Sequence, residues 1–144
     1  MTPSRETIMQ ALFARLETAG SFATASRRLR LWTALAPADA PALFLAERSE
    51  TRDRPSEATP GRTTLEADIF LYTYAGEDPN AVPASSMNAL LDSIDAALAP
   101  DPVTGTQTLG GLVSHCWIAG KILNDPGDLD GKGVAILPVK ILVP

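Results

Sequence analysis

Apolar residues recur every three to four positions in two stretches of the chain, residues 4–19 and 85–98. This spacing places them on one side of a helix, so it predicts two amphipathic helices that each bury one stripe. The apolar positions are Ile8, Met9, Leu12, Phe13 and Leu16 in the first helix, and Met87, Leu90, Leu91, Ile94 and Leu98 in the second. The expected N-caps are Thr2 or Ser4 for the first helix, and Ser85 or Ser86 for the second.

A different pattern, with apolar and polar residues alternating, predicts a strand over residues 63–74. Further strands are expected at residues 24–32, 42–48, 113–123 and 133–143. The last of these is apolar nearly throughout, which is typical of a central strand. Pro138 lies within it and lacks a backbone N–H, so we expect a bulge or an edge at that point.

Residues 33–41, 75–84 and 99–106 contain the prolines and glycines expected of connections. Residues 49–62 are polar, with two prolines and a glycine, and are longer than most structureless connections. If residues 42–48 pair with residues 63–74, these two strands form a hairpin with a projecting arginine-bearing arm at about 49–62. Such an arm is a natural contact surface.

Two helices and a mixed or antiparallel sheet of four to five strands predict an α+β fold. The 144 residues fit a single domain covering 1–144, and we see no internal repeat. A composition of 45% hydrophobic and 20% charged residues is ordinary for a globular protein. Charged side chains interrupt the opening segment, so we expect neither export nor a membrane span.

Charge is distributed unevenly along the chain, whose net charge is −5. Residues 1–62 hold nine arginines against seven acids, whereas residues 63–120 hold seven acids and no lysine or arginine. One hypothesis is a head-to-tail interface between copies, and the alternative is ordinary solvated charge. The candidate basic interface residues are Arg27, Arg28, Arg30, Arg52, Arg54 and Arg62. The candidate acidic residues, for an interface or a lumen, are Glu66, Asp68, Asp92 and Asp95.

Residue counts exclude several kinds of chemistry within one chain. Cys116 is the only cysteine and His115 the only histidine, so an intrachain disulfide or a Cys/His zinc site cannot form, which fits a reducing cytoplasm. No G-x-S-x-G motif accompanies the histidine, and the partial phosphate-loop and calcium-loop patterns lack their diagnostic residues. We therefore expect no catalytic, cofactor or metal site.

Nucleic-acid binding is a weak alternative. Arg27, Arg28 and Arg30 next to Trp32 could contact a single strand by charge and stacking. The negative net charge argues against it, because affinity for nucleic acid comes from neutralising phosphates. A protein-facing edge or solvated charge explains these arginines better.

Three stretches carry a resemblance to a known family: RRLRLWTALAPADAPALFLAE (27–47), MNALLDSIDAALAPDPVTGTQTLGGLVSHCWIAGKI (87–122) and VAILPVKILVP (134–144). With the opening RETIMQALFARL they cover well over half of the chain. In these stretches the chain resembles the tail terminator, or tail completion, proteins of long-tailed bacteriophages, the group that includes the terminator of lambda-like siphophages. The middle stretch is the most specific, with a helix, a PDP-x-TG turn, an LGG bend and the HCWI strand.

The resemblance implies a virion protein that forms a homohexameric ring at the head-proximal end of the tail tube, after assembly in the host cytoplasm. Such a ring stops tube polymerisation and presents a surface for head attachment. Its partners would be itself, the major tail tube protein and a neck or head-completion protein, and DNA would pass through the lumen without specific binding. An acidic lumen suits this passage because like charges repel. The alternatives are another neck or head-closure ring protein and, from a different class, a small ligand-binding or enzymatic domain.

Overall fold

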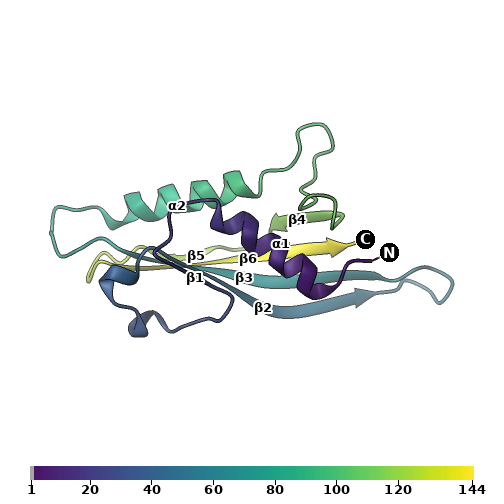
Figure 1. The fold of residues 1–144 in the computed structure, drawn as a ribbon, viewed down its shortest axis with the longest axis horizontal. Helices are drawn as coiled ribbons and strands as arrows, with labels where there is room; N and C mark the ends of the chain where they lie inside the picture. The colour runs from purple at the N-terminus through teal and green to yellow at the C-terminus, as the bar shows by residue number, and fades with distance from the viewer. Residues whose placement is uncertain (1) are drawn as a thin grey trace.

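A computed structural model describes residues 2–144, and within this range six strands form one mixed sheet in the order β1-β2-β3-β6-β4, with β5 also paired to β6 (Figure 1). β1 pairs with β2 in parallel, and every other pairing is antiparallel. The strands are β1 Thr24–Ser26, β2 Ala42–Asp53, β3 Arg62–Tyr74, β4 His115–Ile118, β5 Leu123–Asp125 and β6 Lys132–Val143. The helices are α1 Arg5–Glu17 and α2 Pro83–Ala97, with short 3-10 turns at Trp32–Ala34 and Pro37–Asp39. The predicted α+β class with a mixed sheet and two main helices is confirmed.

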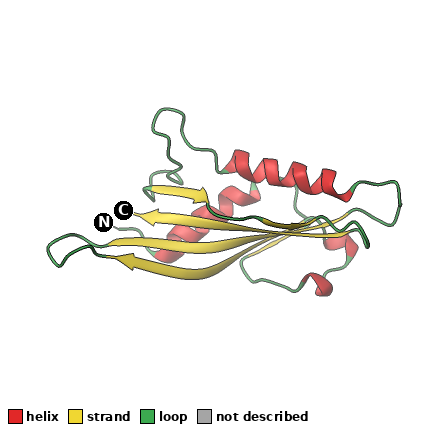
Figure 2. Ribbon diagram, turned by 180° about the vertical axis from the view of Figure 1, so that it is seen from behind, coloured by secondary structure: helices red, strands yellow, loops and turns green. Residues whose placement is uncertain are grey.

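Both helices lie on the same face of the sheet, and α1 lies behind the strands when the molecule is turned (Figures 1 and 2). Buried residues from α1, α2 and the inner face of the sheet form one core cluster. Leu12 and Ile94 come from the two helices, and Ile69 and Leu137 come from the two central strands. Each large aliphatic side chain buried in this way contributes about 1.5–3 kcal/mol.

The two helices begin differently. The Ser4 side chain caps α1, because its Oγ accepts a hydrogen bond from the Thr7 backbone N–H at 3.1 Å. Of the two predicted caps, Thr2 and Ser4, the second is confirmed. At α2 the expected serine cap is wrong. Val82 is the N-cap residue and makes no side-chain capping bond, and Pro83 occupies the first turn. Proline is favoured there because its missing N–H would have no helical partner.

β6 is central, as predicted, with β3 on one side and β4 and β5 on the other. The single strand expected at 113–123 is wrong, since β4 ends at Ile118 and β5 begins at Leu123. Pro138 explains the break: its carbonyl accepts from the Ala119 N–H at 2.9 Å, so its missing N–H is on this same side of β6. The ladder cannot continue opposite the proline, and residues 120–122 leave the sheet as a bulge.

β2 and β3 form the expected hairpin, but the connection between them is shorter than predicted. Residues 49–53 continue β2 in register with β3 after an irregularity between Glu47 and Ser49, so only residues 54–61 are loop. The strand expected at 24–32 is also shorter, because β1 pairs with β2 at three positions only. Residues 27–31 leave the sheet after that pairing ends.

Candidate assembly surfaces

Residues 27–41 connect β1 to β2 and cover one end of the sheet face opposite the helices. The Tyr72 hydroxyl donates a hydrogen bond to the Arg30 carbonyl at 2.8 Å. Phe44 contacts the Tyr72 ring at a centroid distance of 5.4 Å, and Leu35 packs against the same cluster. Burial raises the pKa of Tyr72, so the hydroxyl remains a donor. This cluster fixes the backbone of the crossing segment on the sheet.

Two of the predicted interface arginines project from this segment beside exposed apolar side chains. Arg28 and Arg30 are exposed, and within residues 2–144 neither guanidinium forms an ion pair. Leu29, Leu31 and Trp32 are 41%, 73% and 39% exposed. We call residues 28–32 the basic-apolar patch. Large apolar side chains grouped on a surface in this way are typical of a protein interface.

Arg27 is separated from this patch by its partners. Its guanidinium binds both carboxylate oxygens of Glu6 in α1, at 2.6 and 3.0 Å, and lies 3.4 Å from a carboxylate oxygen of Glu47 in β2. The hydrogen bonds with Glu6 raise the pKa of Arg27 and lower the pKa of Glu6. Arg27 therefore joins α1 to the sheet within one chain.

The arginines of the β2–β3 hairpin are largely engaged within the chain. Arg52 binds Glu50 at 3.1 Å. Arg5 donates hydrogen bonds to the same carboxylate, and these bonds contribute most to lowering the pKa of Glu50 to about 2. Arg54 donates to backbone carbonyls of the 54–61 loop and so shapes its tip. Arg62 is exposed at the end of the hairpin.

The four predicted acidic residues do not gather on one surface. Glu66 and Asp68 lie on the sheet face opposite the helices, where both approach Arg48 at 3.7 Å and Glu66 approaches Lys140 at 3.6 Å. A hydrogen bond from Ser49 is the main cause that lowers the pKa of Glu66. The other two acids, Asp92 and Asp95, are exposed on α2, which covers the opposite side of the sheet.

A third group of acids, which the sequence analysis missed, lines a hollow at one end of the molecule. Glu77 and Asp78 follow β3, while Asp128 and Asp130 lie in the turn before β6, and the hollow measures about 690 Å³. None of the four forms an ion pair with another described residue. Leu129, in the same lining, is fully exposed. We call this surface the acidic hollow.

Two loops that are about fifty residues apart in sequence meet at this hollow because of a glycine contact. The Ala75 N–H donates to the Gly131 carbonyl at 2.8 Å. Gly131 has φ +76°, and a Cβ on it would collide with the Gly76 carbonyl oxygen. Only the absence of a side chain at Gly131 allows this approach. The two loops meet because β3 and β6 are antiparallel neighbours, so that β3 ends where β6 begins.

His115 and Cys116, the residues considered for chemistry, have structural surroundings. His115 Nδ1 accepts a hydrogen bond from the Gln107 backbone N–H at 3.1 Å, and its ring stacks on Trp117 at 4.8 Å. Cys116 is fully buried, and burial raises its pKa to about 12, which disfavours the reactive thiolate. Among residues 2–144 no three His, Cys, Asp or Glu side chains are grouped as a metal site would need. In the same range no helix has the length and apolar character that crossing a membrane requires.

The fold, as distinct from the sequence, matches a known protein. No protein-family model matches the chain, and no curated protein is similar to it in sequence. A solved structure described as the virion of a native gene transfer agent particle contains a chain with the same fold. The match has a TM-score of 0.53 and 12% identity, and covers 94% of this chain and 93% of that chain. The protein thus has the α+β fold of a subunit found in that virion, over nearly the full length of both chains.

Proposed function

We propose that the protein is a structural subunit of a phage-like particle, and more narrowly a tail terminator that forms a homohexameric ring at the head-proximal end of the tail tube. The observation that carries the proposal is the near full-length fold match to a chain of a gene transfer agent virion. The resemblance of residues 27–47, 87–122 and 134–144 to tail terminators supports the narrower position. In this proposal the chain acts through its surfaces and performs no chemistry.

The surfaces are suited to assembly. The basic-apolar patch and the acidic hollow are both exposed, both carry large apolar side chains, and they have opposite charge. The elongated sheet separates the β2–β3 loop at one end from the β3–α2 loop at the other (Figure 1), and the β3–α2 loop contributes Glu77 and Asp78 to the acidic hollow. A ring subunit needs distinct surfaces for its neighbours, for the tube below it and for the neck above it, and separate ends provide them.

A tube-polymerisation assay tests the function. Purified tube subunits are polymerised with increasing amounts of the protein, and electron microscopy gives the tube length. A terminator shortens the tubes in proportion to its concentration and appears at one end only. Tubes of unchanged length without the protein at either end contradict the proposal.

A neck or head-closure ring protein is the nearest alternative, since such a protein also belongs to the virion of a phage-like particle. It predicts attachment to tail-free heads, whereas a terminator attaches to head-free tails. Incubating the labelled protein with each isolated particle separates these two functions.

A further inference from the structure

The strongest unassigned surface outside the core is the basic-apolar patch, residues 28–32. Its backbone is attached to the sheet by the hydrogen bond from the Tyr72 hydroxyl to the Arg30 carbonyl, which restricts the patch before any partner binds. A surface ordered in advance loses little conformational entropy on binding. Exposed arginine, tryptophan and leucine side chains together combine the residue types of an interface core with two unpaired charges.

The acidic hollow has the complementary chemistry. Four carboxylates surround it against a single lysine, Lys132, and the fully exposed Leu129 provides an apolar contact. The hollow has room for several side chains, including guanidinium groups that need carboxylate partners. The patch offers two free guanidinium groups and three apolar side chains, so charge and apolar character both match.

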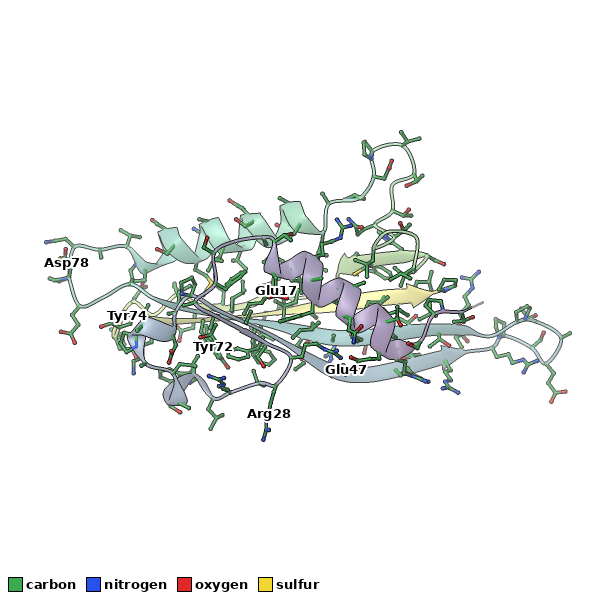
Figure 3. All side chains as sticks on the ribbon, viewed as in Figure 1. Glu17, Arg28, Glu47, Tyr72, Tyr74 and Asp78 are labelled. Carbon is green, nitrogen blue, oxygen red and sulfur yellow. The ribbon has the colours of Figure 1, made fainter. Side chains whose placement is uncertain are left out.

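The two surfaces adjoin at Trp32, whose ring lies 5.5 Å from Lys132 Nζ, but among residues 2–144 neither Arg28 nor Arg30 forms an ion pair with the carboxylates of its own hollow. The Arg28 side chain points away from the sheet at one long edge, whereas Asp78 projects from the end of the molecule (Figure 3). Arg28 and Asp78 therefore extend in different directions. Each chain therefore carries one unused surface of each kind, which is the arrangement required for a heterologous contact between identical copies.

We propose that the basic-apolar patch of one copy binds in the acidic hollow of the next copy, and that this contact joins neighbours in the ring. The inference rests on the proposed function, because it names the contact between subunits of that ring. It gives Arg28 and Arg30 a partner, and it transfers the acidic side of the interface to Glu77, Asp78, Asp128 and Asp130. Arg27 has no part in the contact, since it is bound to Glu6 within its own chain.

Cross-linking tests the contact directly. The native cysteine is fully buried, so Leu31→Cys and Leu129→Cys introduce the reactive thiols on the two surfaces. A chain with both substitutions, treated with a short bismaleimide, should give a ladder of covalent oligomers that ends at the closed ring. An equal mixture of the two single variants should stop at dimers, because each chain then has one reactive thiol. Absence of cross-links in a preparation whose rings are visible by electron microscopy overturns the proposed contact.

Charge reversal gives an independent test. Arg28→Glu with Arg30→Glu, or Asp128→Lys with Asp130→Lys, should each weaken assembly at least about tenfold at low salt, because like charges then face one another. Mixing the two variants should restore assembly with alternating copies. Asp92→Lys with Asp95→Lys, on the outer side of α2, is the matched control and should assemble normally. Reversals that leave assembly unchanged overturn the contact.

The outcomes separate the contact from the proposed function. If the wild-type chain forms rings and both charge-reversal variants also form them, this contact is refuted but the ring-forming terminator is not. The same holds if the two-cysteine chain forms rings but gives no cross-links. A wild-type chain that assembles neither in solution nor on tail tubes refutes the terminator function and the contact together. Sedimentation of the wild-type chain with and without tubes distinguishes these cases.

Discussion

Gly131 should be a position in the fold that tolerates no side chain, because it is buried where the two loops of the acidic hollow meet. Its φ of +76° is costly for any residue with a side chain, and a Cβ would collide with the Gly76 carbonyl oxygen. An alanine in the left-handed region costs about 1–2 kcal/mol, and forcing an extra carbon into a closed contact adds about 1–3 kcal/mol. Gly131→Ala should therefore lower the free energy of unfolding by about 2–5 kcal/mol.

Gly120→Ala is the matched control for this prediction. Gly120 has φ +81°, but no atom within 4 Å would meet its Cβ, so only the backbone cost of about 1–2 kcal/mol applies. Urea denaturation followed by circular dichroism gives both free energies on the same scale. Equal destabilisation by the two substitutions would refute the argument that the approach of Gly131 to Gly76 requires glycine.

Three further predictions concern the patch, the hairpin and the core. Tyr72→Phe removes the hydrogen bond to the Arg30 carbonyl and should cost about 1–2 kcal/mol in urea denaturation, whereas Tyr74→Phe should stay within about 0.5 kcal/mol; equal costs would contradict this role of the hydroxyl. Glu50 has its pKa lowered from 4.5 to about 2, so its ion pair stabilises the fold above pH 4.5 and this contribution is lost as pH falls toward 2. Glu50→Gln should therefore show a shallower loss of stability over that range, and identical pH profiles would oppose the assignment. Cys116 should react with a thiol reagent only on unfolding, and rapid modification of the folded protein would contradict its burial.

Local pattern in the sequence was sufficient for the elements that have an apolar side. The spacing of Leu12 and Leu16 predicted α1, and the alternation around Ile69 predicted β3, because burial of one side imposes the period of the helix or strand. β2 was predicted only as far as Arg48. Its continuation through residues 49–53 is exposed on both faces, so no apolar period marks it.

The errors elsewhere have causes distant in sequence. The division of the expected strand at 113–123 follows from Pro138 in the neighbouring strand, which no local window around Ile118 contains. The same holds for the surfaces. Arg27 is next to Arg28 in the sequence, but its guanidinium binds Glu6, which lies twenty-one positions earlier. The carboxylates of the acidic hollow come from two loops that only the strand order brings together, so no local window of the sequence groups them.

Imaging of isolated tails that carry the labelled protein tests the central claim most directly. The account predicts label at one end of each tail tube, the end that joins the head, and a six-fold ring in averages of that end. Label along the tube, at the distal tip or on heads alone would contradict a tail terminator.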